Sequence, residues 1–276
     1  LGVTSSAVGK SVSRLERRLG IKLLHRTTRK LVLTHEGEVY LSSCLHIIDE
    51  LRDIESNMST GISEPRGRLR VDLPAAFGRR HIAPMLIDLS KQFSQLDLTL
   101  TFGERTIDMI GEGVDLAVRI GDLHNDPELV ARKLGQARML AVASPAYLAQ
   151  YGHPGHPSEL TQHRCLGYSA KTTNRPLVFA IDGVPQPWHL PYRLQANNGD
   201  ALAEAAAQGL GITVQPDFIV DDLLQQGRLV TVLQAFEPPP FGIYAILPSN
   251  RYLPHRVRVL IDFLATALAP TVPAAG

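Results

Sequence analysis

The stretch Thr4-Ser5-Ser6-Ala7-Val8-Gly9-Lys10-Ser11-Val12-Ser13-Arg14-Leu15-Glu16-Arg17-Arg18-Leu19-Gly20 has the pattern of one helix with both of its ends. Thr4 is a good N-cap, because its hydroxyl can accept a hydrogen bond from a free N–H group of the first turn. Gly20 supplies the left-handed residue that often follows a last turn. Between them, apolar residues recur at helical spacing along one stripe: Val8, Val12, Leu15 and Leu19. The pattern predicts an amphipathic helix that ends near residue 19.

The face turned away from this stripe carries short hydroxyls near the start of the helix and cations further along. Such a face suits a helix that enters the major groove of DNA with its N-terminus first. An ordinary surface helix with a solvated basic face is the alternative, and it is the commoner case for a helix taken alone. We expect DNA contacts from the following side chains: Ser5, Ser6, Lys10, Ser13 and Arg14.

Residues 21–34 hold two short apolar runs around a basic tip that is rich in threonine. This pattern is typical of a β-hairpin, which would form a wing beside the helix. Cations and hydroxyls at the tip of a wing are placed to meet DNA phosphate groups. The expected contacts at the tip are Arg26, Thr27, Thr28 and Arg29.

A second, longer helix is predicted after the hairpin. Thr34 can cap it, and Glu36 lies in its first turn, where the helix dipole favours a negative charge. Apolar residues then follow in steps of four and three, the spacing of a coiled-coil seam: Tyr40, Cys44, Ile47, Leu51, Ile54 and Met58. We expect this helix to pair with its copy in a homodimer or homotetramer. A helix packed on its own domain is the alternative, although few residues after Met58 could fold back over it.

Several segments of this region resemble one known family: Leu1-Gly2-Val3-Thr4, Ala7-Val8, Leu15-Glu16, Arg18-Leu19-Gly20, Leu23-Leu24-His25-Arg26-Thr27-Thr28-Arg29, Leu33-Thr34 and Glu36-Gly37. In this order they resemble the winged helix-turn-helix of LysR-type transcriptional regulators. The resemblance implies a recognition helix, a wing and a dimerisation helix, with double-stranded promoter DNA as partner and RNA polymerase as a further one. The domains are then a partial winged helix-turn-helix over residues 1–36 and a dimerisation helix with its hinge over residues 37–65.

Two features depart from the family pattern. Gly9 stands where the family commonly has a polar residue, and a glycine inside a helix costs about 0.5–1 kcal/mol relative to alanine. The chain also begins at Leu1 without a methionine. The resemblance therefore implies an N-terminal truncation that removes the family's first helix and most of its second.

The charge of the chain is concentrated at its start. Residues 1–36 contain eight Lys or Arg and two Glu, a net charge of +6, and the whole chain of 276 residues carries +1, so the remainder carries −5. A basic head on a mildly acidic body points to a polyanion bound at one end. Only Cys44 and Cys165 are present, which suggests a reducing compartment, and no apolar run approaches the roughly 20 residues of a membrane helix. We expect a cytoplasmic protein without a membrane partner.

After a polar hinge near residues 59–67, strand and helix patterns alternate. From residue 68 to residue 121 the order is strand, helix, strand, short helix (106–112) and strand, which argues for a parallel sheet with helical crossovers. A second unit of the same kind follows from residue 139, and residues 151–191, rich in Gly, Pro and His, give the weakest pattern. The body is therefore predicted to be α/β.

Three further segments resemble the effector-binding domain of the same family: Val114-Asp115-Leu116-Ala117-Val118-Arg119-Ile120-Gly121, Ala143-Ser144-Pro145-Ala146-Tyr147-Leu148 and Gly209-Leu210-Gly211-Ile212. That domain is similar to periplasmic solute-binding proteins, which have two α/β lobes joined by two crossover strands. The resemblance implies an effector-binding domain over residues 66–276. Lobe I is expected at about 66–137 and 248–276, and lobe II at about 138–247.

In open parallel sheets, ligands bind beyond the carboxyl ends of strands, where helix N-termini present free N–H groups. The turns at 75–78 and 197–200 meet this condition, and Arg119 ends a strand. One cation and two helix starts favour a small anionic effector such as a carboxylate, and no other cofactor is expected. The expected contacts are Ala76, Phe77, Gly78, Arg119, Asn198, Gly199 and Asp200. Purely structural roles are the alternative: Asn198 as a helix cap, Gly78 in a turn, and Arg119 paired with an acid such as Asp122.

Other classes of protein explain less of the chain. No Gly-x-Ser-x-Gly elbow, phosphate-cradling loop or helical pair of zinc-binding histidines is present, so an enzyme is not expected. The spacing of His153, His156, His163 and Cys165 fits no standard zinc pattern, so no metal site is expected. A solute-binding protein of the periplasmic type without DNA binding would explain the body but would leave the basic head and the seam helix unused.

Overall fold

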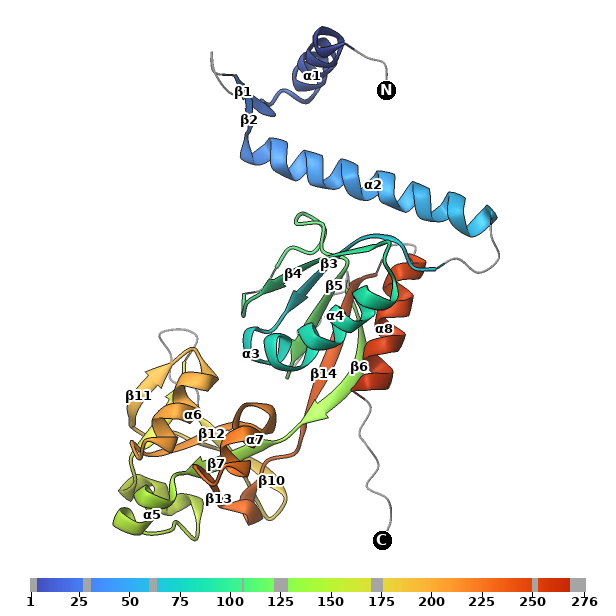
Figure 1. Ribbon diagram of the computed structural model, residues 1–276. Helices are drawn as coiled ribbons and strands as arrows, with labels where there is room; N and C mark the ends of the chain where they lie inside the picture. Colours follow the sequence, from blue (N-terminus) through green and yellow to red (C-terminus); the bar gives the residue numbers. More distant parts are fainter. Residues whose placement is uncertain are drawn as a thin grey trace.

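The computed structural model describes residues 4–26, 31–59, 64–105, 107–121, 129–169, 176–249 and 253–268. The molecule consists of a small N-terminal module, one long helix and two α/β lobes (Figure 1). The N-terminal module contains α1 (Ser5–Leu19) and the hairpin of β1 (Leu24–Arg26) and β2 (Leu31–Leu33), and the long helix is α2 (His35–Ser59). Helix α2 contacts lobe I through a hydrogen bond of 2.6 Å from Arg70 Nη1 to Ser42 Oγ. No helix among the described residues is long and apolar enough to cross a membrane.

Lobe I is built on a five-stranded sheet in the order β4-β3-β5-β14-β6. Its strands are β3 (Gly67–Leu73), β4 (Leu96–Phe102), β5 (Leu116–Ile120), β6 (Leu129–Ala137) and β14 (Phe241–Pro248). β3 runs parallel to β4 and β5, as the alternation of strands and helices predicts. β14 runs antiparallel to both β5 and β6, so the sheet is mixed. The antiparallel strand arises because the chain returns from lobe II into the middle of this sheet.

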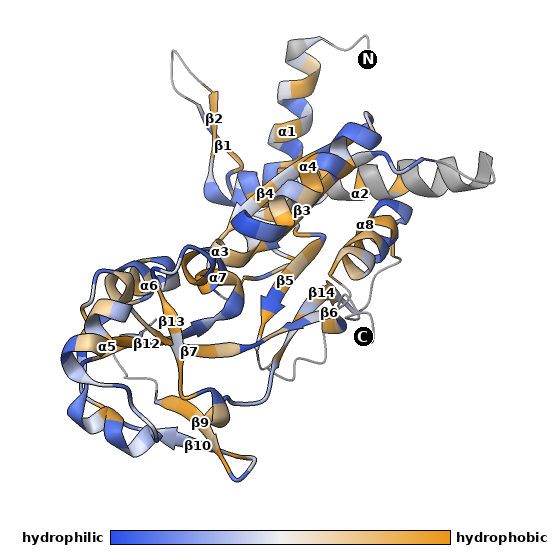
Figure 2. Ribbon diagram, turned by 60° about the horizontal axis from the view of Figure 1, so that its bottom comes forward, coloured by the Kyte–Doolittle hydropathy of each residue, from blue (hydrophilic) through white to orange (hydrophobic). Residues whose placement is uncertain are grey.

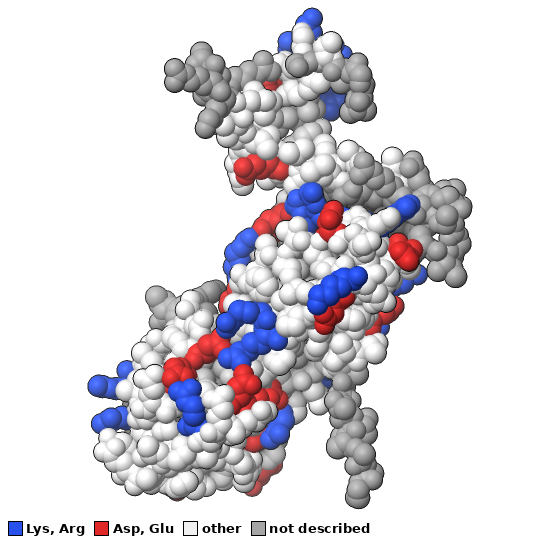
Figure 3. All heavy atoms as spheres, viewed as in Figure 1, with Lys and Arg blue, Asp and Glu red and all other residues white. Residues whose placement is uncertain are grey.

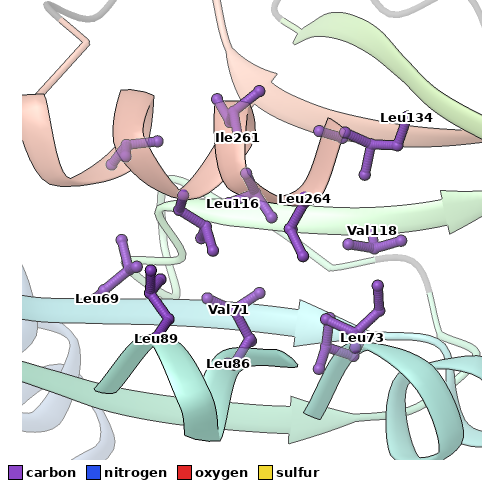
Figure 4. Close-up of a cluster of buried hydrophobic side chains, with 14 of the residues drawn as sticks. Leu69, Val71, Leu73, Leu86, Leu89, Leu116, Val118, Leu134, Ile261 and Leu264 are labelled. Atoms are coloured by element: carbon purple, nitrogen blue, oxygen red, sulfur yellow. The ribbon is translucent and has the colours of Figure 1, made fainter. Parts of the chain in front are cut away.

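The main core of lobe I lies on one face of its sheet, and a smaller buried cluster of Met109, Val114, Ala117 and Ile246 lies on the other face. Alternate residues of the central strands point to the face of the main core, because side chains along a strand alternate between its two sides. Two helical segments cover it: α3 (Ala75–Phe77), η1 (Gly78–Ile82) and α4 (Ala83–Gln92) in succession, and α8 (His255–Ala267) near the end of the chain. Figure 4 shows the strands and the inner sides of both helical segments meeting in one buried cluster: Leu69, Val71, Leu73, Leu86, Leu89, Leu116, Val118, Leu134, Ile261 and Leu264.

Lobe II is a second α/β unit with a sheet in the order β11-β8-β12-β7-β13. Helices and short segments cover both faces of this sheet, since the two sides of β7 contribute to two separate buried clusters. Its elements are β7 (Met139–Ala143), α5 (Pro145–Tyr151), η2 (Pro157–Gln162), β8 (Cys165–Tyr168), β9 (Leu177–Ile181), β10 (Val184–Trp188), β11 (Tyr192–Ala196), α6 (Gly199–Ala207), β12 (Ile212–Pro216), α7 (Asp217–Gln225), β13 (Val230–Val232) and η3 (Gln234–Phe236). Figure 2 shows the β9–β10 hairpin at the edge of this lobe, with a hydrophobic β9 and a more polar β10.

The structure corrects two expectations about the body. β14 belongs to the sheet of lobe I, so lobe II does not extend to residue 247. The short helix expected at 106–112 is also wrong, because the described part of this segment forms turns. Asp108 Oδ1 accepts a hydrogen bond of 2.9 Å from the N–H of Gly111, as in a helix N-cap, but Gly113 adopts a left-handed φ of 65° and ends the turn before a helix can continue.

Candidate functional site

Helix α1 has the two ends that its sequence predicts. Thr4 Oγ1 accepts a hydrogen bond of 3.3 Å from the N–H of Ala7. Gly20 adopts a left-handed φ of 73°, and its N–H donates to the carbonyl of Glu16 at 2.9 Å. Of the DNA contacts expected on this helix, three are exposed (Ser6, Lys10 and Arg14), Ser13 is half-buried, and the side chain of Ser5 lies outside the described residues.

Glu16 joins helix α1 to the β1–β2 hairpin. Its side chain is buried, and Oε1 accepts hydrogen bonds from the N–H of Leu23 at 3.0 Å and of Leu24 at 3.2 Å. Lys22 Nζ lies 3.3 Å from Oε2. The hydrogen bond from Leu23 is the main reason why the pKa of Glu16 lies below its ordinary value, and it outweighs the opposing effect of burial. This carboxylate fixes the start of β1 against the end of α1.

The wing forms as predicted from β1 and β2, which pair antiparallel with Leu24 opposite Leu33 and Arg26 opposite Leu31. Arg26 ends β1, and its side chain lies outside the described residues. The other expected tip contacts, Thr27, Thr28 and Arg29, also lie outside the described residues.

Helix α2 begins as predicted, because Thr34 Oγ1 accepts a hydrogen bond of 2.9 Å from the N–H of Gly37. Along the expected seam, Tyr40 and Cys44 are half-buried, whereas Ile47 is 63% and Leu51 is 56% exposed in the single chain. The side chains of Ile54 and Met58 lie outside the described residues. Large apolar side chains exposed in a row on one helix are typical of a surface that a partner covers.

A cavity of about 580 Å³ lies between the two lobes. Lobe I contributes the segment before and through α3 and the end of β5, and lobe II contributes the start of α6, the start of α7 and β9. Most of the lining side chains are apolar, with a few polar groups among them, which is the usual composition of a small-molecule site. The lining includes Phe77, Ile120, Met139, Leu177, Val178, Val214, Phe218, Ile219 and Phe241 as apolar groups, and Glu104, Arg119, Asn197, Asn198 and Gln215 as polar groups.

Five of the expected effector contacts meet at this cavity: Ala76, Phe77, Arg119, Asn198 and Gly199. Arg119 Nη2 lies 2.7 Å from Asp72 Oδ2, so its ion-pair partner is a buried acid 47 residues away in sequence. Asn198 also caps α6, because its Oδ1 accepts a hydrogen bond of 2.9 Å from the N–H of Ala201. A Cβ on Gly199 would lie 2.5 Å from Ile219 Cδ1 and 2.7 Å from Gln215 Oε1, so the ends of these two side chains approach the glycine closely.

The other two expected contacts are absent from the cavity lining. Gly78 is buried behind it, and a Cβ there would lie 2.5 Å from the Cβ of Leu73, so close packing explains the glycine. Asp200 turns to lobe I, where its Oδ1 lies 2.7 Å from Arg80 Nη2 and its Oδ2 lies 2.9 Å from Arg79 Nη2. Its carboxylate is therefore engaged with cations instead of with the cavity.

Glu104 is a cavity residue that the sequence patterns do not reveal. Its Oε1 accepts a hydrogen bond of 3.0 Å from the N–H of Ala75, at the start of the helical segment that borders the cavity. The sequence patterns do not reveal Leu177 and Val178 either, since these cavity residues lie within the stretch that has the weakest pattern. Only the pairing of distant segments brings these residues together.

The histidines considered for a metal site lie apart from the cavity. His163 Nδ1 is 3.2 Å from the hydroxyl of Tyr147, and the ring of His156 packs edge-on against Phe236. Burial raises the pKa of the Cys165 thiol to about 11. Among the described residues, no three His, Cys, Asp or Glu side chains are grouped to hold a metal ion.

Two family models match the chain in the regions just described. Residues 1–38 match the bacterial regulatory helix-turn-helix protein of the lysR family, and residues 63–269 match the LysR substrate binding domain. The chain belongs to the LysR family of transcriptional regulators. In this LysR-type regulator, α1 and the wing thus lie in the DNA-binding domain and the cavity lies in the substrate-binding domain.

Individual regulators are similar to this chain over most of its length. An HTH-type transcriptional regulator from Xanthomonas campestris pv. campestris is 36% identical over 272 residues, which cover 97% of this chain and 79% of the relative. The solved structure of CrgA, a LysR-type regulator from Neisseria meningitidis, is 33% identical with a TM-score of 0.67, over 97% of this chain and 90% of that one. The full-length structure of AphB, a virulence activator of Vibrio cholerae, is 27% identical with a TM-score of 0.65, over 96% and 90%.

Proposed function

We propose that this LysR-type regulator binds promoter DNA as a dimer or tetramer through α1 and the wing, in the cytoplasm, and communicates with RNA polymerase there. The exposed side chains of Ser6, Lys10 and Arg14 on α1 support a groove-facing surface. The exposed Ile47 and Leu51 on α2 support pairing of two copies, which would present two recognition helices to two half-sites.

A small carboxylate with an apolar body is the effector that we propose for the cavity. The observation that carries this proposal is the composition of the lining, in which Arg119 and the start of α6 face apolar walls formed by both lobes. Arg119 has five N–H donors, and the described hydrogen bonds to Val118 and Asp72 use two of them. An effector that contacts both lobes would favour one lobe orientation over others and thereby alter DNA binding.

A mobility-shift assay with the DNA upstream of the protein's own gene tests the DNA-binding part. We expect binding that competitor DNA of unrelated sequence does not abolish. Lys10→Ala should change the preference among operator sequences, because this side chain lies on the exposed face of α1. An unchanged sequence preference would place Lys10 away from the bases.

Thermal-shift measurements test the effector part. The probes are monocarboxylates of increasing apolar size, from acetate to phenylacetate, each compared with its neutral amide. We expect the larger acids to stabilise the protein more than their amides. Val178→Trp, which adds bulk at the cavity wall, should abolish the shift, whereas Val184→Trp on the other strand of the same hairpin should preserve it. Equal shifts by acids and amides would contradict the carboxylate, and equal loss in both variants would contradict the cavity.

A further inference from the structure

A cluster of ion pairs joins the two lobes beside the cavity. Arg80, on η1 of lobe I, places Nε 3.1 Å and Nη2 2.7 Å from Asp200 Oδ1 in α6 of lobe II. Arg80 Nη1 lies 2.9 Å from Asp222 Oδ2 in α7, and Arg79 Nη2 lies 2.9 Å from Asp200 Oδ2. We call these four residues the interlobe ion cluster. Figure 3 shows basic and acidic side chains in contact over the junction of the lobes.

Residues of the ion cluster are close in sequence to residues that line the cavity. Phe77 lines the cavity, and Arg79 and Arg80 follow it in the same helical segment. Gly199 lines the cavity from the other lobe, and Asp200 is the next residue. A movement of either helix start would therefore shift the ion cluster and the cavity wall together.

Aromatic rings reinforce this junction. The Phe77 ring of lobe I and the Phe218 ring of lobe II are 4.9 Å apart between centroids, in an edge-on arrangement. His81 stacks on Phe77 at 5.1 Å and meets Phe218 at 6.0 Å. Because Phe77 and Phe218 also line the cavity, this contact connects the ligand space to the cluster.

Of the ion pairs in the cluster, the one between Arg80 and Asp200 should contribute most to the attraction between the lobes. Their side chains are 30% and 24% exposed, whereas those of Arg79 and Asp222 are 66% and 67% exposed. Exposed pairs are screened by solvent, and partly buried pairs are screened less. The planar guanidinium of Arg80 fixes both the direction and the distance of the carboxylates that it binds, because several of its N–H groups donate hydrogen bonds at once.

We propose that Arg80 and Asp200 are positioning residues for effector binding, which hold the two lobes at the angle that gives the cavity its shape. The chain crosses between the lobes at Arg138 and again between η3 and β14, and such connections allow a hinge motion. Contacts across the junction then determine which angle is populated. This proposal deepens the proposed function, since it rests on the cavity as the effector site.

Pulsed electron paramagnetic resonance tests the proposal without any ligand. Spin labels at Ile87→Cys in lobe I and Val184→Cys in lobe II report the distance between lobes, since both positions are exposed. Cys44→Ser removes the accessible native thiol, and Cys165 is buried. Labelled protein is diluted with unlabelled protein, so that distances within one chain dominate. We expect a narrow distance distribution in the parent protein and a broader or displaced one in both Arg80→Gln and Asp200→Asn.

The matched control is Glu112→Gln, which removes an ion pair with Arg105 that lies within lobe I. It should leave the interlobe distance unchanged. Circular dichroism checks that each variant is folded. Because Arg80 lies in lobe I and Asp200 in lobe II, the same change of distance in both variants indicates a change of lobe orientation and not a local defect in one lobe. Unchanged distance distributions in folded Arg80→Gln and Asp200→Asn would overturn the proposal.

A second readout links the cluster to binding. The carboxylate that stabilises the parent protein most should bind Arg80→Gln and Asp200→Asn about fivefold or more weakly, the lower end of typical coupling between sites. Equal affinity in parent and variants would also overturn the positioning role. If no carboxylate stabilises the parent, the proposed effector class fails, whereas the distance measurement still decides the role of the cluster.

Discussion

Glu16 shows how one buried carboxylate can determine the geometry of a DNA-binding module. Its Oε1 atom holds the N–H groups of Leu23 and Leu24 at the point where the chain leaves α1 for the wing. Buried donors without an acceptor are costly, so the position of β1 depends on this side chain.

Glu16→Gln should lower the thermal stability of the N-terminal module at neutral pH, because the amide accepts weaker hydrogen bonds than the carboxylate. The pKa of Glu16 is lowered in the folded state, so its contribution to stability is present above the ordinary value of 4.5 and is lost as the pH falls through the lowered value. Unfolding followed between about pH 3 and pH 7 should therefore have a shallower acid limb in the variant. An identical pH dependence in both proteins would contradict this role.

Arg256 is a second buried charge, in α8, with its side chain 1% exposed and Nη2 3.9 Å from Asp115 Oδ1. Arg256→Met should destabilise the protein by about 3–5 kcal/mol, because it removes the cation beside a buried carboxylate. Urea unfolding measures this change. Arg258→Met, at an exposed position of the same helix, is the control and should change stability by less than about 0.5 kcal/mol.

At the residue scale, local signals are predictable and distant partners are not. The caps at Thr4, Gly20 and Thr34 depend on neighbours within four residues, so the sequence indicates them. The partner of Arg119 is Asp72, on a neighbouring strand, and no local pattern indicates that pair. Asp200 looks like a ligand contact in sequence for the same reason, since its partner Arg80 is 120 residues away.

At the scale of elements, helix α2 has two different sides: one contacts lobe I and the other carries the apolar seam. Ser42 Oγ contacts Arg70 of lobe I, and a Cβ on Gly113 would lie 2.9 Å from that oxygen, so the helix approaches the lobe closely there. Ser42 lies two residues from Tyr40 and from Cys44, which is roughly 200° around a helix. The seam is therefore turned away from the lobe, as the proposed pairing of two copies requires.

Ile47→Glu should convert the protein to a lower oligomeric state, because it places a charge in the middle of the seam. Sedimentation equilibrium measures the change. Glu38→Lys is the control, since it alters charge at an exposed position of the same helix away from the seam and should leave the association unchanged. Retention of the parent mass by Ile47→Glu would show that the seam is not the interface.

The sequence indicates most elements but not every sheet position. Long periodic segments such as α1, α2 and α8 are predictable because their apolar spacing is repeated over several turns. β14 is a short apolar run, and nothing in its own residues shows that it pairs with β5 and β6 of the first lobe. The β9–β10 hairpin lies in a stretch rich in Pro and Gly, which obscures the strand pattern.

At the scale of the molecule, positive charge at one end predicts a strong dependence of DNA binding on salt. Arg29→Ala should weaken binding to all DNA sequences and reduce the slope of log K against log salt by about 1, as expected for one lost phosphate contact. Filter binding between about 50 and 200 mM salt measures the slope. Arg132→Ala, an exposed cation of lobe I, is the control and should leave the slope unchanged. A loss confined to one operator would instead assign Arg29 to base recognition.

The path of the chain through the two lobes also orders events during synthesis. Lobe II is complete at about residue 236, whereas the sheet of lobe I still lacks β14 and its α8 cover at that point. Within the described sheet, β6 pairs only with β14, so it has no neighbouring strand until β14 leaves the ribosome. The lobe that begins first is therefore finished last. We expect a nascent chain to pass through a stage in which the inserted lobe is folded while its host still exposes open strand edges.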